Sequence, residues 1–189
     1  LPIGKIRTDG KENLIAAIEI AAAYDQEKAI VPEVCILFGD KLFRGNRTTK
    51  INAESFDAFQ SFNYPALANI GIHIHYDYSA IDYTPRTELV SAFCDVDTNI
   101  AILKIFPGMR PEVIDAVTGI PGLKGIILET YGSGNAPTNK VFLNKVKEVL
   151  SKGIFVYNVT QCQGGSVEMG KYETSRELLN AGVISGHDI

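Results

Sequence analysis

A hydroxyl-rich and positively charged segment follows an apolar run near the start of the sequence. The run VPEVCILF leads through Gly39 and Asp40 into residues 41–59, KLFRGNRTTKINAESFDAF. Two arginines, an asparagine and two threonines stand just before Lys50. Such a lysine is an ordinary surface charge, unless burial or neighbouring charges lower its pKa from about 10.4 and make it useful in catalysis. The pattern alone leaves both interpretations open.

Two histidines could contribute to a metal site. His73 and His75 are two residues apart in a run that is typical of a strand, so both side chains are expected on one face. Two imidazoles can bind zinc, but a structural zinc site has four ligands and no partner cluster is evident in the sequence. We therefore favour ordinary strand histidines, and no metal.

A glycine-rich segment, LETYGSGNAPTNK, separates a predicted buried strand from a predicted helix at residues 128–140. Glycines there let backbone N–H groups approach a ligand, and a helix N-terminus favours an anion. The spacing is not GxGxxG and no GK[ST] follows, which argues against the common nucleotide-binding motifs. A ligand-binding loop at the carboxyl end of a parallel strand and a simple turn with Pro137 near the helix start both remain possible.

Cys162, in NVTQCQGG, also follows a predicted strand. With a distant base such as His187 it could form a nucleophilic pair, since a thiolate needs a base to form. The local signatures of such pairs are absent, and we do not favour this hypothesis.

Composition narrows the choice of class. Hydrophobic residues make up 46% and charged residues 21%, as in an ordinary globular protein. The net charge of −4 gives no basic surface for nucleic acid, and no apolar run approaches the roughly 20 residues of a membrane span. Three cysteines without a CxxC pair suit a reducing cytoplasm better than a disulfide framework.

Mixed helices and strands are predicted in the first part of the chain. A helix is predicted at 7–25, with Leu14, Ile15 and Ile18 on one face, then a strand at 32–38 that is apolar throughout and hence covered on both faces. A return strand at 41–45, a helical turn at 51–59 and a strand at 66–77 follow.

A different pattern begins near residue 99. Strands at 100–108, 123–130 and 154–161 alternate with helices at 109–119, 138–153 and 172–182, which predicts a parallel α/β sheet. We expect residues 1–76 to belong to one domain, 77–97 to be a linker, and 98–189 to form a second α/β domain.

Three strings together resemble one family. RGNRTTK (44–50), ILETYGSGNAP (127–137) and NVTQCQGGSVEMGKY (158–172), in this order and spacing, resemble the bacterial type I, cytoplasmic L-asparaginases. The resemblance covers nearly the whole chain. It implies a two-domain α/β fold with parallel sheets flanked by helices, whose N-terminal domain is incomplete here. It also implies a cytoplasmic homotetramer, a dimer of dimers, without metal or organic cofactor.

The same resemblance implies an activity and residue roles. Enzymes of this family hydrolyse L-asparagine to L-aspartate and ammonia through a threonine acyl-enzyme. Lys50 matches the lysine of the family's proton-handling triad. Asn135 matches a loop asparagine that reaches into a neighbouring subunit's site and helps to hold the amino-acid head of the substrate.

A regulatory site is implied as well. Cys162 and Thr49 match residues with which type I enzymes bind asparagine as an activator, whereas Glu129 stands where an arginine is found. An anion in place of a cation weakens the capture of a carboxylate, so we expect weak or absent activation.

Two motifs of the family do not occur in these 189 residues. The GGTI motif carries the nucleophilic threonine, and HGTDTM carries a second threonine and an aspartate; both are expected to precede Leu1. We therefore expect this chain alone to be inactive. The alternatives are an asparaginase-like subunit of a tRNA-dependent amidotransferase, and a non-catalytic asparagine-sensing module that uses the glycine-rich loop and Cys162.

Overall fold

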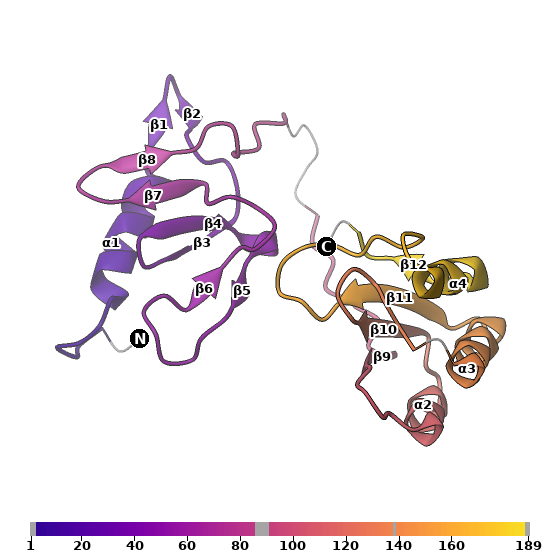
Figure 1. The fold of residues 1–189 in the computed structure, drawn as a ribbon. Coiled ribbons are helices and arrows are strands. Elements are labelled where there is room, and N and C mark those ends of the chain that lie inside the picture. The colour runs from indigo at the N-terminus through magenta and orange to yellow at the C-terminus, as the bar shows by residue number, and fades with distance from the viewer. Residues whose placement is uncertain (1–2, 86–90, 138, 188–189) are drawn as a thin grey trace. The chain divides into compact units, whose positions relative to one another are not determined.

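The computed structural model describes residues 3–85, 91–137 and 139–187 and shows two compact units, residues 1–89 and 90–189 (Figure 1). The boundary falls inside the predicted linker 77–97, of which residues 86–90 lie outside the described residues. At the beginning of that segment, Ala80 and Ile81 are buried in the core of the first unit. No helix in the described part of the chain is long and apolar enough to cross a membrane.

The first unit combines one helix with short antiparallel strands. Its elements are α1 (Gly10–Ala21), β1 (Tyr24–Asp25), β2 (Lys28–Ala29), β3 (Cys35–Phe38), β4 (Lys41–Arg44), the 3-10 turn η1 (Gly45–Arg47), β5 (Thr49–Lys50), β6 (Phe59–Gln60), β7 (Ala68–Ile70) and β8 (Ile74–Tyr76). Strands β3, β4, β7 and β8 form one sheet in that order, and β1–β2 and β5–β6 are separate hairpins. The core of this unit gathers Ile20, Leu42, Leu67, Ala68, Ala80 and Ile81.

Three expectations for the first unit are wrong. Residues 51–59 do not make a helical turn, because Oδ1 of Asn52 accepts the backbone N–H groups of Glu54 and Ser55 and so closes the β5–β6 hairpin. The predicted strand at 66–77 is a tight hairpin of β7 and β8 around Gly71. The strand at 32–38 shortens to β3, a half-buried edge strand that pairs only with β4 among the described strands.

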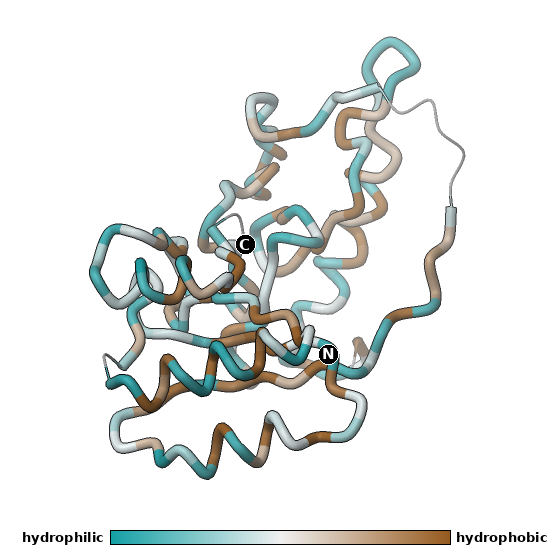
Figure 2. The backbone as a smooth tube through the Cα atoms, turned by 90° about the vertical axis from the view of Figure 1, so that its right-hand side faces the viewer, coloured by the Kyte–Doolittle hydropathy of each residue, from teal (hydrophilic) through white to brown (hydrophobic). Residues whose placement is uncertain are grey.

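Helix α1 also departs from expectation. Its predicted apolar face is at least half exposed, at 51% for Leu14, 55% for Ile15 and 60% for Ile18. Ile20 is the residue that α1 buries. Figure 2 shows hydrophobic and hydrophilic residues alternating along the helical coils, a pattern that predicts the helices but does not by itself select the buried face.

The second unit is a parallel α/β layer, as predicted. Its elements are β9 (Ile100–Lys104), α2 (Pro111–Thr118), β10 (Gly125–Thr130), α3 (Lys140–Ser151), β11 (Phe155–Thr160), α4 (Glu173–Ala181) and β12 (Ile184–Ser185). The strands lie in the order β12-β11-β10-β9, and every pair is parallel. The α/β class with a parallel sheet flanked by helices is thus confirmed in this unit.

The three helices of the second unit lie along one face of its sheet (Figure 1). Alternate strand residues such as Leu103, Ile126 and Val156 are buried against them. The intervening residues face the other side, where Ile100, Ile102 and Phe155 are exposed. One face of this sheet is therefore buried against the helices. The loops that follow the carboxyl ends of its strands carry most of the candidate residues.

Candidate active site

Lys50 and Thr49 form the short strand β5 in the first unit. β5 pairs with β6 in antiparallel register, Thr49 opposite Gln60 and Lys50 opposite Phe59. Both side chains are exposed, and Nζ of Lys50 lies 6.0 Å from the centroid of the Phe59 ring. Lys50 makes no salt bridge within the residues that the structure describes. Its ammonium group is therefore exposed to solvent.

Arg44, in the same charged segment, has a structural role instead. Its guanidinium donates to both carboxylate oxygens of Glu33, at 2.5 and 3.0 Å, and to the carbonyl of Ala80 at 3.2 Å. It also lies over the Tyr64 ring, 4.2 Å from the centroid. The hydrogen bond from Arg44 holds the pKa of the Glu33 carboxyl below its ordinary value of 4.5.

Backbone and side-chain hydrogen bonds flank β5 on both sides. The hydroxyl of Thr48 donates to the carbonyl of Arg44 at 2.7 Å, and the N–H of Ile51 donates to the carbonyl of Ala58 at 2.8 Å. The strand that carries Lys50 is thus fixed at both of its ends. In the charged segment 41–50, Arg44 is thus a partly buried structural anchor, whereas Lys50 is exposed.

The glycine-rich segment of the second unit is a closed loop at the end of β10. Tyr131 and Asn135 exchange two backbone hydrogen bonds, of 2.8 and 2.9 Å. Gly134 has a φ of 109°, and a Cβ there would come within 2.9 Å of Cγ1 of Val167, so only glycine fits. The N–H of Glu168 donates to the carbonyl of Ser133 at 2.9 Å and ties the loop to a segment that follows β11.

The side chain of Asn135 has a defined partner. The hydroxyl of Thr174, in the first turn of α4, donates to Oδ1 of Asn135 at 3.2 Å. Below the loop, the hydroxyl of Thr130 donates to Oδ1 of the buried Asn158 at 2.6 Å. The Thr174 contact thus holds the loop from the side, and the Thr130–Asn158 hydrogen bond joins β10 to β11 at its base.

Glu129 lies on the opposite face of the sheet from its neighbour Thr130, as alternation along a strand requires. Its carboxylate is 3.2 Å from Nζ of Lys104 on the adjacent strand β9. Nε2 of Gln161 donates to the carbonyls of Ile105 and Glu129, at 2.6 and 2.9 Å, and joins the ends of β9 and β10. The predicted regulatory position is therefore occupied by a carboxylate with its own cation.

Cys162 is an exposed residue just beyond β11, where its N–H donates to Oγ1 of Thr160 at 3.0 Å. His187 follows β12, the neighbouring parallel strand, so both residues lie at the same edge of the sheet. Both side chains are exposed.

The two other histidines do not share a strand. His73 lies in the turn between β7 and β8 and His75 lies in β8, and both are exposed. No group of three or more His, Cys, Asp or Glu side chains that could hold a metal occurs in residues 3–85, 91–137 and 139–187.

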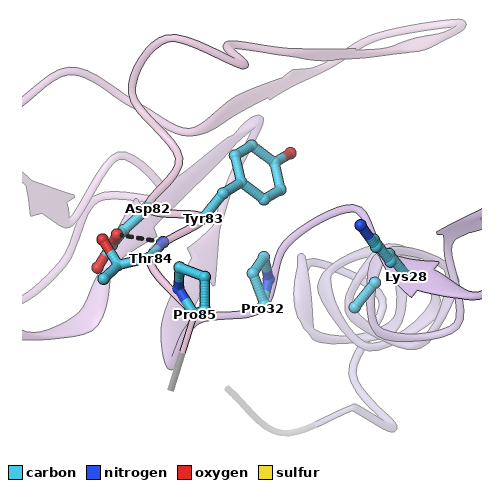
Figure 3. A pocket seen from close by; sticks show the side chains of 7 residues that line it. Lys28, Pro32, Asp82, Tyr83, Thr84 and Pro85 are labelled. Atoms are coloured by element: carbon cyan, nitrogen blue, oxygen red, sulfur yellow. Dashed lines mark hydrogen bonds between the residues drawn. The ribbon is translucent and has the colours of Figure 1, made fainter. Parts of the chain in front are cut away.

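A cavity of ≈ 580 Å³ in the first unit involves none of the predicted residues. Figure 3 shows its lining, in which Pro32, Tyr83 and Pro85 supply apolar surface and Lys28 the positive charge. The hydroxyl of Tyr83 donates to the carbonyl of Ile30 at 2.7 Å.

Several residues around the loop were not predicted from the sequence. Thr130 and Asn158 are polar residues inside otherwise apolar strands, and a buried polar residue of this kind could have indicated a hydrogen-bonded pair. Thr174 and Lys104 gave none, because their partners lie 39 and 25 residues away in sequence and only the fold brings them together.

Comparison with known proteins gives a consistent result. The family model "Asparaginase, N-terminal" matches residues 1–82, and "Glutaminase/Asparaginase C-terminal domain" matches residues 99–189. L-asparaginase 1 of Escherichia coli strain K12 is 40% identical over 189 residues, which cover 100% of this chain and 54% of that protein. The crystal structure of L-asparaginase I from Vibrio cholerae superposes with a TM-score of 0.87 at 36% identity and covers 100% of this chain and 55% of that one.

A second class of relative is more distant. One component of the glutamyl-tRNA(Gln) amidotransferase of Pyrococcus abyssi is 28% identical over 195 residues, covering 99% of this chain and 44% of that protein. In each of these comparisons the chain spans about half of the relative's length or less.

Proposed function

This chain belongs to the asparaginase family, and from that premise we propose that the gene product carrying it hydrolyses the side-chain amide of L-asparagine to L-aspartate and ammonia. One observation carries the proposal. The identity of 40% to L-asparaginase 1 of Escherichia coli extends over all 189 residues, through both units. Amide hydrolysis is the activity that the relatives' names support most directly.

We propose a threonine nucleophile supplied from outside these 189 residues. Its hydroxyl attacks the side-chain amide carbon, a C–O bond forms, the C–N bond breaks, and the departing nitrogen takes a proton and leaves as ammonia. Water then cleaves the acyl ester and releases aspartate. A hydroxyl is a weak nucleophile at its own pKa, so a relay must take and return its proton.

Lys50 is the member of that relay in this chain. A lysine can serve as a base when its surroundings lower its pKa, and it has three rotatable donors for passing protons. The assignment rests on the match of Lys50 in RGNRTTK to the family's lysine, and the hairpin that carries it, held at both ends, leaves its ammonium accessible to groups outside these residues.

We propose a homo-oligomer in which Asn135 serves the site of a neighbouring subunit. The position of the Tyr131–Asn135 loop at the carboxyl edge of the sheet suits a ligand-facing role. A cytoplasmic location belongs to the same proposal, and three unpaired thiols are compatible with it.

The test is ammonia release from L-asparagine by the complete gene product and by its Lys50→Met variant. Loss of a general acid–base group lowers kcat by roughly 100-fold or more, so Lys50→Met should be nearly inactive. Lys11→Met, which removes an exposed lysine of α1, is the matched control and should keep the wild-type rate. A Lys50→Met variant with the wild-type kcat would contradict the assignment.

The same assay separates the alternatives. A component of a tRNA-dependent amidotransferase would release little ammonia alone and much more with its partner and charged tRNA. A sensing module would bind asparagine without releasing ammonia. The isolated 189-residue chain is expected to release none, and L-glutamine measured in parallel gives the substrate preference.

A further inference from the structure

Thr174 and Asn135 meet across 39 residues of sequence. Thr174 lies in the first turn of α4, and Asn135 closes the glycine-rich loop after β10. The Thr174 hydroxyl donates to Oδ1 of Asn135 at 3.2 Å. This is the hydrogen bond that the structure gives the Asn135 side chain.

The backbone of Asn135 is fixed independently of this contact. Its N–H donates to the carbonyl of Tyr131 at 2.8 Å, and its carbonyl accepts the N–H of Tyr131 at 2.9 Å. The backbone at Gly134 packs closely against Val167 and Asn158, so that a residue larger than glycine would meet both. What remains free at Asn135 is rotation about its side-chain bonds.

Thr174 is held equally firmly. Its neighbour Ser175 is completely buried, and Oγ of Ser175 accepts the N–H groups of Gly170 and Tyr172, at 3.2 and 3.3 Å. The same hydroxyl donates to the carbonyl of Tyr172 at 2.9 Å. The first turn of α4 is therefore anchored at its start, and the Thr174 hydroxyl has a defined place.

The contact sets the polarity of the amide. An asparagine side chain has an acceptor oxygen and a nitrogen that only donates. With Oδ1 turned toward the Thr174 hydroxyl, Nδ2 points away from it. Within the described part of the chain, Nδ2 makes no hydrogen bond, so two N–H donors are available to a ligand.

We propose that Thr174 is a positioning residue, which orients Asn135 so that Nδ2 donates to an acceptor oxygen of the substrate's amino-acid head group. This inference rests on the proposed function, because it assumes that Asn135 binds the substrate. It adds which atom of Asn135 makes the contact and which residue selects that atom.

Thr174→Val and Thr174→Ser form the decisive pair in the complete gene product. Valine has the shape of threonine without the hydroxyl, whereas serine keeps the hydroxyl. Losing one such hydrogen bond should raise KM for L-asparagine about 3- to 10-fold in Thr174→Val, with kcat changed less than about 2-fold. Thr174→Ser should stay within about 2-fold of wild type in both constants.

Two further variants separate positioning from general damage. In an Asn135→Ala background, Thr174→Val should have no additional effect on KM, because its only route to the substrate is gone. Asn135→Asp keeps the shape but removes both donors, and it should raise KM more than Thr174→Val does. If Asn135→Asp binds L-asparagine as well as wild type does, the group that Asn135 offers is not a donor and the inference fails.

A crystal structure of Thr174→Val at atomic resolution gives a readout independent of turnover. We expect the Asn135 amide to rotate or to take two orientations. An unchanged amide would overturn the inference even if KM rises. If the wild-type protein releases no ammonia, the proposed function fails, and the amide orientation still decides whether Thr174 sets it.

Discussion

The hydroxyl of Thr130 donates a 2.6 Å hydrogen bond to Oδ1 of Asn158, and both side chains are completely buried. They occupy adjacent strands, β10 and β11, on the face that the helices cover. Within the described residues, Nδ2 of Asn158 has no partner. The floor beneath the glycine-rich loop is thus a polar pair in an apolar core, and it already contains one unsatisfied donor.

Replacing Thr130 with valine should destabilise the second unit. The hydroxyl disappears at nearly constant shape, and Oδ1 of Asn158 is left in the core without its donor, which costs about 1–3 kcal/mol. The free energy of unfolding in urea measures this, with the exposed Thr98→Val as matched control. Thr130→Ser should recover most of the loss. A Thr130→Val protein as stable as Thr98→Val would show that the pair contributes nothing.

Glu33 makes the stability of the first unit depend on pH. Its pKa is lowered in the folded state by the hydrogen bond from Arg44, so the ionised carboxylate stabilises the fold. That contribution is complete above the ordinary pKa of 4.5 and is lost as pH falls through the lower folded value. The stability advantage of wild type over Glu33→Gln should therefore be constant near neutrality and shrink below about pH 4.5.

Urea unfolding of wild type and Glu33→Gln from pH 3 to pH 7 tests this. Glu54→Gln, an exposed substitution in the same unit, should show no comparable loss. An advantage that grows as the solution is acidified would reverse the sign that we derive for Glu33.

The three thiols should differ in reactivity. Burial, followed by the nearby Glu33 carboxylate, raises the pKa of Cys35 to about 11, so little thiolate forms at neutral pH. Cys94 and Cys162 are exposed. Iodoacetamide at pH 7.5 should modify these two cysteines in the native protein and spare Cys35 until urea unfolds it, as peptide mass mapping would show. Early labelling of Cys35 would mean that β3 opens readily.

Activation by L-asparagine should be weak or absent. The Glu129 carboxylate, paired with Lys104 at 3.2 Å, repels the carboxylate of an incoming amino acid where a cation would attract it. The rate of the complete gene product should depend hyperbolically on L-asparagine concentration. A sigmoidal curve that becomes hyperbolic in Cys162→Ser, but not in the exposed control Cys94→Ser, would refute this.

The parallel sheet could be predicted from the sequence because its signals are local. Apolar strands alternate with helices from Ile100 onward, and Gly153 and Gly182, with φ of 77° and 104°, follow the ends of α3 and α4. In the first unit, where competing turns and distant packing partners decide the outcome, the same reasoning failed. A turn at Asn52 replaces the helical turn predicted at 51–59, and the apolar face of α1 stays exposed.

The candidate site follows the same division. Asn135, Glu129 and Cys162 could be placed at strand ends, because the sequence itself marks where an apolar strand gives way to a polar or glycine-rich loop. The residues that orient them could not, because Thr174 and Lys104 act through contacts that only the fold creates. The local pattern left the role of Lys50 open and only the family resemblance singled it out, whereas the structural role of Arg44 emerged only with Glu33 and Tyr64 around it.

In space, Asn158 lies between Gly134 and Gly186, and this limits which substitutions the protein can accept. A methyl group at Gly134 would come within 3.3 Å of its amide nitrogen, and one at Gly186 within 2.6 Å of its backbone oxygen. A smaller residue at 158 would not make room for a side chain at 134, because Cγ1 of Val167 lies within 2.9 Å of the same Cβ, and it would remove the partner of Thr130. Positions 134, 158 and 186, which lie far apart in the sequence, are thus coupled. A single substitution at any of them is expected to make the protein less stable.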